Sequence, residues 1–228
     1  MNATVRAMAE DMTVHWAAQI SRIERYGPVW HLFGNGTELG LFDAVVLAIP
    51  VEQALPYLSL HAFNLAMTAA KARSEPCWAA MFVFDQPVRG PADIIRDRGL
   101  IGWAARNGAK PDRSGPEAWL VQATPAWSAE HLECSGEAVE QALFNALGEA
   151  LGLTMPAPVS TTAHRWRFAR SAGLGIGALW DGATGIGACG DWLLAPRVEC
   201  AWLSGRQLAE AIATSAIAAH PAVMASGQ

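Results

Sequence analysis

The chain has 228 residues, of which 52% are hydrophobic and ten are tryptophan, and its formal net charge is −5. This length accommodates one sizeable core or two interleaved domains, and because no run of Lys and Arg occurs, nucleic acid is excluded as an expected partner. Neither a secretory signal nor a membrane span is expected, because charged residues interrupt the apolar segments near both ends.

The first third of the chain predicts a short helix followed by strands. The Asn35-Gly36 dipeptide favours a tight primed turn, so residues 29–33 and 38–42 are expected to pair as a hairpin. The apolar run at 43–49 is typical of a strand covered on both faces, and Pro50 suits the first turn of a helix. The elements expected here are helices at 2–10, 50–58 and 61–73 and strands at 13–16, 19–25, 29–33, 38–42 and 43–49.

The rest of the chain predicts a mixture of strands and two longer helices. Val139, Leu143 and Leu147 recur every four residues, which is the clearest helical signal of the chain. No internal repeat, low-complexity segment or linker divides it. The elements expected here are strands at 78–84, 100–106, 118–124 and 163–169 and helices at 136–151 and 198–213.

Two glycine-rich stretches imitate a dinucleotide-binding loop. Residues 185–190 match G-x-G-x-x-G, and residues 173–178 match the form that ends in alanine. Such a loop requires a helix that opens on the last glycines and an acidic residue at the end of a second strand. Asp191 and Pro196 intervene before any helix follows the first stretch, and Trp180-Asp181-Gly182 follows the second. We therefore interpret these glycines as serving turns and close backbone packing.

Residues 185–208 carry the strongest functional signal. A strand of small residues leads to Gly190-Asp191, a short loop with Pro196, and a helix that begins near Arg197. This order aims the free N–H groups and the partial positive charge of a helix N-terminus at an electron-rich ligand. The segment resembles the tail of the renalase-like branch of FAD-dependent amine oxidases, in which a Gly-Asp pair precedes a helix reading R-V-E-G-A-W-L-S-G.

Further blocks in the family's order extend the resemblance over most of residues 1–211. They are similar to the family's F-D-A-V-V-L-A-x-P strand and turn, its central strand, its G-W-x-x-x-N-x-x-K-P-x-R stretch and two tryptophan-containing signatures. Each block alone is short, so their shared order carries the identification. The blocks occupy residues 42–50, 76–85, 101–113, 123–128 and 164–169.

The resemblance implies an α/β fold with two interleaved domains. One is an incomplete FAD-binding, Rossmann-like domain at 1–56 and 171–220. The other is a substrate-binding domain at 57–170, built on a mostly antiparallel sheet with helices, and residues 221–228 would form a tail. The family opens with a dinucleotide-binding βαβ head that has no counterpart in this sequence. Because Met1-Asn2-Ala3 matches the middle of the family's P-G-M-[SN]-A motif, we interpret Met1 as an internal methionine of the ancestral sequence.

The resemblance also assigns residues to FAD. Asp191 would meet the ribityl-pyrophosphate arm, although an aspartate there could equally cap the following turn. Ile20 would meet the adenine through its backbone, and it could equally be an ordinary core residue. Cys200 replaces a glycine of the family, so its side chain would crowd the flavin ring. The cofactor-binding residues implied are Ile20, Gly190 and Asp191, together with Arg197, Val198 and Glu199, whose helix-start amides would face the flavin pyrimidine edge.

Three tryptophans, Trp103, Trp127 and Trp166, are candidates for the walls of a substrate pocket, with burial in the core as the alternative for each. Arg165 and Arg167 alternate with Trp166 on an expected strand and should face away from it, toward solvent or an ion pair. The histidines show no metal-ligand spacing, and no catalytic side chain is expected. Four cysteines without a C-x-x-C pair favour a reducing, cytoplasmic setting.

The resemblance implies hydride transfer from a reduced substrate to FAD and reoxidation by oxygen, and renalase-type members act on isomeric dihydronicotinamide dinucleotides. The alternative is a flavin-free remnant or a binding module without activity of its own, since the sequence has no phosphate-binding head. A separately encoded head chain, or a second copy of this chain, would cover the apolar surface that is exposed without the head. A nicotinamide-dependent reductase without flavin would rest only on the glycine-rich stretches.

Overall fold

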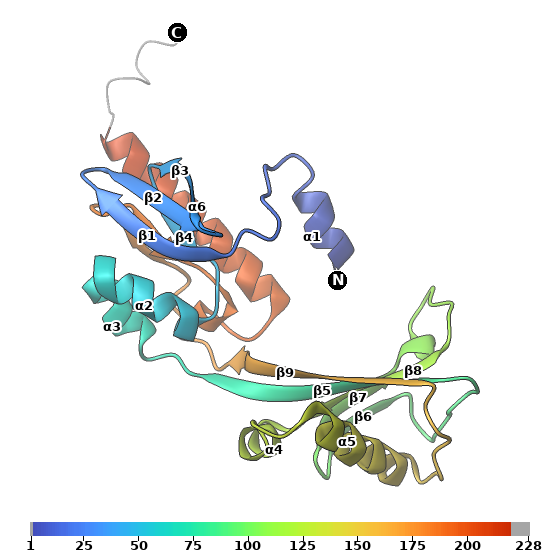
Figure 1. The fold of residues 1–228 in the computed structure, drawn as a ribbon. Helices are drawn as coiled ribbons and strands as arrows, with labels where there is room; N and C mark the ends of the chain where they lie inside the picture. The colour runs from blue at the N-terminus through green and yellow to red at the C-terminus, as the bar shows by residue number, and fades with distance from the viewer. Residues whose placement is uncertain (1, 220–228) are drawn as a thin grey trace.

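Three sheets distributed over two units organise the fold (Figure 1). The structure, a computed structural model, describes residues 2–219. We name residues 74–171 the lower unit and residues 20–69 with 179–219 the upper unit, after their places in Figure 1. The fold is mixed α/β with mostly antiparallel pairing, which confirms the expected fold class. Within residues 2–219, every helix is too short or too polar to cross a membrane.

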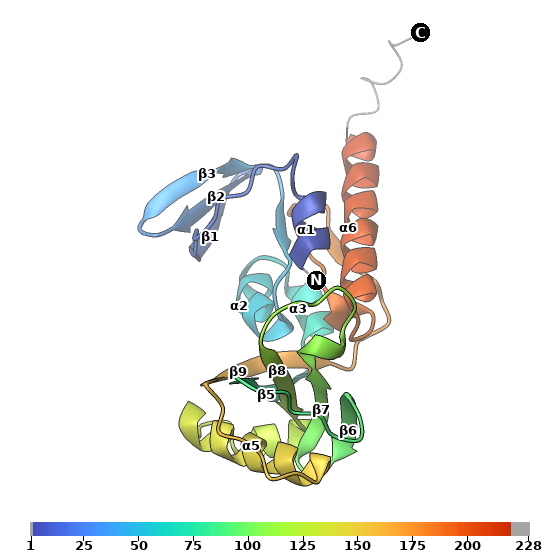
Figure 2. The same ribbon diagram turned by 90° about the vertical axis from the view of Figure 1, so that its right-hand side faces the viewer.

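The lower unit is an antiparallel sheet of five strands with helix α5 lying across one face (Figure 2). The strand order is β6-β7-β8-β5-β9, so β6 and β9 form the two edges. Side chains of the covered face, among them Phe82 and Trp119, are buried in one hydrophobic cluster with Leu143 of α5. The bounds are β5 Ser74–Phe84, β6 Ile94–Arg98, β7 Ile101–Arg106, η1 Asn107–Ala109, β8 Glu117–Ala123, α4 Pro125–Glu130, α5 Gly136–Leu151 and β9 Ser160–Ser171.

Helix α5 has the bounds that its periodicity predicts. At its start the Ser135 hydroxyl accepts a hydrogen bond from the Ala138 amide, and at its end Gly152 adopts a left-handed conformation with φ 66°. The side chains at four-residue spacing, including Val139 and Leu147, are buried against the sheet. Capping residues and the buried stripe thus agree, and the prediction is confirmed.

The upper unit joins two three-stranded sheets and packs helices against them. Strand β4 pairs in parallel with β11, which pairs antiparallel with β10. The other sheet has the strand order β1-β2-β3. Trp30 of β2 is fully buried, and its indole N–H donates to the Thr184 carbonyl at 2.9 Å, which links this sheet to the loop before β11. The bounds are β1 Ile20–Tyr26, β2 Val29–Gly34, β3 Thr37–Phe42, β4 Val45–Leu47, α2 Val51–His61, α3 Phe63–Ala69, β10 Leu179–Asp181, β11 Ile186–Ala188, η2 Asp191–Leu193 and α6 Val198–Ala219, and helix α1 Asn2–Met8 precedes the unit in the chain.

Glycines act where the backbone turns or packs closely. Asn35 and Gly36 connect β2 to β3 with φ of 52° and 80°, as a primed turn requires, so the hairpin prediction is confirmed. On β11, a Cβ at Gly187 would lie 2.6 Å from the Leu179 carbonyl oxygen. The stretch 185–190 therefore contains strand β11 in tight contact with its neighbour and is followed by η2, so no α-helix opens on its last glycine, in agreement with our interpretation.

Several expectations differ from the structure. Residues 13–16 form no strand; that prediction is wrong, because Trp16 is 82% exposed and the segment finds no partner among the described strands. The strand expected at 43–49 is limited to β4, and Val46 is 45% exposed, so coverage of both faces is also wrong. Strand β6 and helix α4 were not expected. Thr124 caps α4 by accepting from the Trp127 amide, and a proline follows at the first position, which is a recognisable helix start.

Helices α2 and α3 contribute to the hydrophobic core of the upper unit. Leu58, Ala62 and Ala69 belong to the hydrophobic cluster that also contains β4 and β11. The domain boundary expected at residue 57 falls within α2. The division at 57 and 171 stays a prediction, and the cluster shows that the residues just after 57 pack with the upper unit.

Candidate functional site

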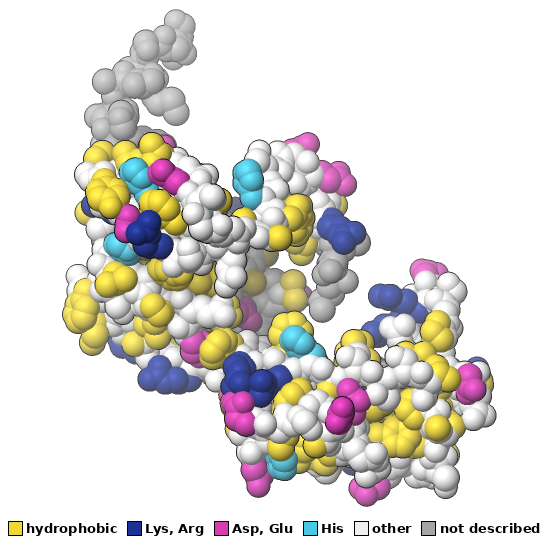
Figure 3. All heavy atoms as spheres, in the orientation of Figure 1, with side chains coloured by type: hydrophobic (Ala, Val, Ile, Leu, Met, Phe, Trp, Pro, Cys, Tyr) yellow, Lys and Arg dark blue, Asp and Glu magenta, His cyan; other side chains and the backbone are white. Residues whose placement is uncertain are grey.

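Two adjoining cavities lie between the lower-unit sheet and the segment from Gly190 to Ala201. Their volumes are about 660 and 210 Å³, and both are lined by Phe168, Ala169, Arg170 and Asp191. The space-filling view shows the molecule hollowed between the two units (Figure 3). The larger cavity has the size of typical small-molecule and cofactor sites, roughly 300–1,000 Å³. The two cavities together are the candidate site.

Gly190 and Asp191 lie where the two cavities meet. Gly190 follows β11, and a Cβ there would lie 2.7 Å from the indole nitrogen of Trp192, so a side chain would displace that ring. Asp191 opens η2, is half-buried and lines both cavities. Its carboxylate makes no hydrogen bond within residues 2–219, and so it is free to accept from a ligand.

Ser204 fixes the backbone of this junction and was not found by sequence reasoning. Its side chain is fully buried, accepts a hydrogen bond from the Gly190 amide at 3.0 Å and donates to the Gly177 carbonyl at 2.5 Å. Helix α6 is thereby tied to the end of β11 and to the loop before β10. The only signal in the sequence is a serine between apolar residues and a glycine in the first half of the helix.

The first turn of α6 flanks the cavities. Pro196 lines the larger cavity and Ala201 lines the smaller. Within residues 2–219, the amides of Val198 and Glu199 have no hydrogen-bond partner, as expected of the first N–H groups of a helix. The side chains of residues 197–199 are exposed, and Cys200 is half-buried and lines neither cavity. This helix start can therefore offer backbone donors and a partial positive charge.

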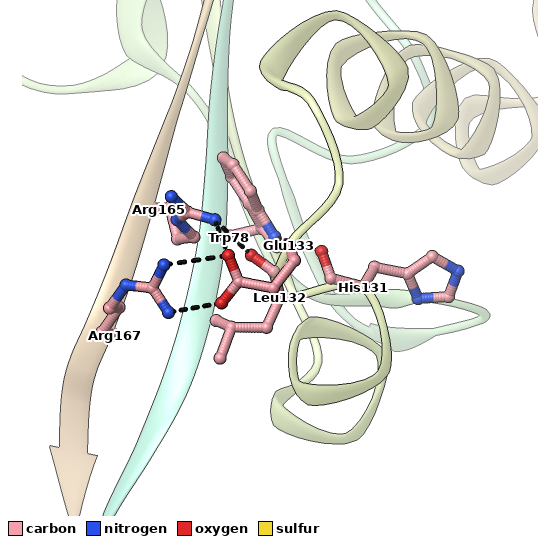
Figure 4. A network of polar contacts seen from close by, with 6 residues as sticks. All are labelled: Trp78, His131, Leu132, Glu133, Arg165 and Arg167. Carbon is pink, nitrogen blue, oxygen red and sulfur yellow. Dashed lines mark hydrogen bonds and ion pairs between the residues drawn. The ribbon is translucent and has the colours of Figure 1, made fainter.

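Strand β9 presents different side chains on its two faces. Trp166, Phe168 and Arg170 line the larger cavity. On the opposite face, Arg165 and Arg167 both contact the Glu133 carboxylate, at 2.8 and 2.6 Å (Figure 4). The prediction that these arginines face away from Trp166 is confirmed, and of the two alternatives left open, solvent or an ion pair, both arginines form an ion pair. The network ties the loop before α5 to the sheet edge that carries the cavity wall.

The Glu133 network predicts an acid-sensitive contribution to stability. The hydrogen bond from Arg167 holds the pKa of Glu133 below its ordinary value of 4.5, with Arg165 acting in the same direction. Because the folded-state pKa is lowered, the stabilisation is present above pH 4.5 and is lost as the pH falls through the folded pKa. The melting temperature of Glu133→Gln should therefore fall less between pH 5 and pH 3, measured by circular dichroism, than that of the wild type. Since Glu133 is exposed, added salt should reduce the difference between the two curves; parallel curves at low salt would contradict this role.

The structure brings some predicted site residues together and places others elsewhere. Trp103 and Trp166 both line the larger cavity. Trp127 lies on α4, packs against the lower-unit cluster and stacks on His131 at a ring distance of 4.1 Å. Ile20 begins β1 and packs, half-buried, against the upper-unit cluster. Ile20 and Trp127 line neither cavity, and the ligand roles of all these residues stay predictions.

The larger cavity contains one thiol, that of Cys77. Burial raises the pKa of Cys77, and its Sγ lies 3.4 Å from the Trp78 carbonyl oxygen. A thiol with a raised pKa is a poor nucleophile at neutral pH. Among the described residues, no cluster of three or more His, Cys, Asp and Glu side chains could hold a metal ion. The cavity thus offers hydrogen bonds, charges and aromatic surface, and its one thiol is a poor nucleophile.

Comparison with known proteins gives a consistent fold. No protein-family model matches the chain. The chain is similar to a protein from Exiguobacterium sp. 255-15 proposed to be a protoporphyrinogen oxidase, with a TM-score of 0.70 and 14% identity over 93% of this chain and 51% of that chain. It is also similar to cyclohexylamine oxidase from Brevibacterium oxydans IH-35A, with a TM-score of 0.60 and 15% identity over 87% of this chain and 48% of that chain.

A third similar structure is an oxidoreductase from Methanosarcina mazei, with a TM-score of 0.60 and 14% identity over 84% of this chain and 48% of that chain. Likeness at such identity establishes the fold, whereas activity depends on the site. The chain spans about half the length of each of these three proteins. Residues 2–219 thus have the fold of about half of these oxidoreductases.

Proposed function

We propose that this chain is an FAD-dependent oxidoreductase of the renalase type, in which the two cavities hold the flavin and a reduced substrate. The observation that carries the proposal is the junction at Asp191. There a glycine-aspartate pair, a helix N-terminus with free amides and an aromatic-lined cavity of about 660 Å³ meet. The fold shared with amine oxidases and the sequence resemblance support the same assignment.

The residues of the junction suit a flavin. The carbonyl-rich edge of a flavin ring accepts hydrogen bonds, and the amides of Val198 and Glu199 are free donors within residues 2–219. Asp191 would accept from the hydroxyl groups of the ribityl arm, and Gly190 would let that arm approach the backbone. Bound FAD would supply the chemistry, accepting a hydride from the substrate and being reoxidised by oxygen.

The chain's own residues bind, orient and exclude water. Trp103 and Trp166 provide flat apolar walls against which a planar substrate would lie. The raised pKa of the Cys77 thiol keeps that thiol protonated beside the reacting groups. By resemblance, the substrate would be an isomeric dihydronicotinamide dinucleotide. A separately encoded chain, or a second copy of this one, would strengthen FAD binding by adding contacts to the phosphates, and the backbone of Ile20 would meet the adenine.

The role of Asp191 is tested with a matched pair of variants. Asp191→Ala removes a hydrogen-bond acceptor for the ribityl arm and should weaken FAD binding about tenfold or more, because such bonds to charged groups contribute about 1.5–3 kcal/mol. Asp85→Ala removes an equal charge from an exposed loop outside both cavities and should leave the affinity unchanged. Titration of each variant with FAD, followed by flavin fluorescence, measures the two affinities. If the two variants had equal affinities for FAD, Asp191 would not contribute to FAD binding.

A further inference from the structure

The larger cavity has an arginine at each edge of the sheet. Arg96 lies on β6, the first edge strand, and Arg170 lies on β9, the other edge strand. Within residues 2–219, neither guanidinium makes a hydrogen bond or an ion pair, whereas Arg106 and Arg165 of the same sheet are both paired. Two cations in this cavity are thus available to a ligand.

The two arginines have different neighbours. Arg170 lines both cavities, as Asp191 does, so it belongs to the junction already assigned to the cofactor. Arg96 lines only the larger cavity. Four strand spacings of about 4.8 Å each separate β6 from β9, roughly 19 Å in all, so Arg96 lies at the far end of the cavity from that junction. Its charge is free for a second ligand.

An aromatic ring lies beside Arg96. Trp103 of β7 is its cross-strand partner, and residues in such register project their side chains on the same face of the sheet. Both residues line the larger cavity, and Trp103 is half-buried. An indole face next to a planar guanidinium suits a ligand that combines a ring with an oxyanion.

Carboxylates in the cavity do not neutralise Arg96. Asp97 and Asp191 also line the cavity, but neither has an oxygen within 4.0 Å of a guanidinium nitrogen of Arg96 or Arg170. A ligand oxyanion could therefore bind Arg96 without first breaking an ion pair of the protein. Asp97 has φ 48° and lies where β6 turns toward β7.

We infer that the far end of the larger cavity binds a ring-bearing oxyanion, an aromatic carboxylate or phosphate ester, with Arg96 on the oxyanion and Trp103 against the ring. As a statement about the substrate, the inference rests on the proposed function, and it names the substrate class as anionic. The site would disfavour a cationic amine, because the ammonium group would face Arg96.

Ligand-observed fluorine NMR on the full chain tests this subsite. The probes are para-fluorobenzoate, para-fluorophenyl phosphate, para-fluorobenzamide and para-fluorobenzylammonium, which share a ring and differ in charge. One or both anions should bind about tenfold more tightly than the ammonium probe, and the preference should shrink with added salt. A preference for benzoate over the phosphate ester, or the reverse, identifies which oxyanion the subsite takes.

Variants locate the subsite. Arg96→Ala should abolish the preference for the anionic probe, and Arg96→Lys should retain part of it, because lysine keeps the charge and loses the planar fork. Arg98→Ala is the matched control: Arg98 is an exposed arginine on the same strand that does not line the cavity, so its loss should change nothing. Equal binding of all probes, tightest binding of the ammonium probe, no binding, or a preference that survives in Arg96→Ala would overturn the inference.

The same titrations separate this inference from the proposed function. The probes are measured with and without FAD, and FAD binding is followed independently by flavin fluorescence. If FAD fails to bind while Arg96 still selects the anion, the proposed function fails and the subsite stands. If FAD binds and the anion preference is absent, the subsite fails and the flavin proposal stands.

Discussion

Replacing Gly173 with alanine is expected to destabilise the protein by roughly 2–5 kcal/mol and to abolish FAD binding. Gly173 has φ 83°, a left-handed conformation that costs an L-residue about 1–2 kcal/mol. A Cβ there would clash with the Leu194 carbonyl oxygen and lie 2.8 Å from the Ala195 Cα, and overpacking of this kind costs about 1–3 kcal/mol. Leu194 and Ala195 connect η2 to α6, so relief of the clash would move the start of α6 away from the cavities.

Gly175→Ala provides the matched control. Gly175 also has a positive φ, 71°, but no atom lies within 4 Å of the position that its Cβ would occupy. This variant should therefore lose only about 1–2 kcal/mol of stability, the cost of the left-handed conformation, and keep its affinity for FAD. Urea unfolding followed by tryptophan fluorescence compares the two. A Gly173→Ala protein as stable as Gly175→Ala would mean that the contact with Leu194 does not fix the site.

Replacing Ser204 with alanine should have the second large effect. The variant leaves two backbone groups without their bond to Ser204: the carbonyl of Gly177, which is buried, and the amide of Gly190, which is half-buried. A buried polar group that loses its hydrogen bond costs about 1–3 kcal/mol. Since Gly190 adjoins Asp191 at the junction of the cavities, FAD affinity should fall together with stability. The free energy of unfolding and the FAD dissociation constant measure the two effects.

Thr214→Ala controls for the loss of a hydroxyl from the same helix. The Thr214 side chain is exposed and bonds only to the Glu210 carbonyl of its own helix. Its removal should change stability by no more than about 0.5 kcal/mol. Ser204→Ala and Thr214→Ala proteins with the same stability would show that the Ser204 contacts do not hold α6 to β11.

Local rules explain why much of the fold could be predicted from the sequence. Helix α5 was predicted to the residue because its buried stripe and its caps lie within one segment. Asn35-Gly36 fixed the hairpin, because a primed turn depends on two adjacent residues. Alternation along β9 placed Trp166 and Arg165 on opposite faces, because side chains of a strand alternate. In each case the information is contained in neighbouring residues.

Features that depend on distant segments were missed. Residues 13–16 read as a strand by composition, but a strand requires a partner, and none of the described strands pairs with them. Arg96 and Arg170 line one cavity only because the sheet order places β6 and β9 at its two edges. Ser204 acts on Gly190 through a helix–strand contact that no local pattern reveals. Sequence reasoning found Gly190-Asp191 and two tryptophans of the cavity, but not the charges that surround them.

The most direct test of the account is a titration of the purified 228-residue chain with FAD, followed by flavin fluorescence and by the visible absorption band of the oxidised flavin. We expect saturable binding of one FAD per chain, with a shift of the absorption band as the ring enters the cavity at Asp191. Absence of binding by a chain that melts cooperatively would contradict the assignment of the two cavities to a flavin.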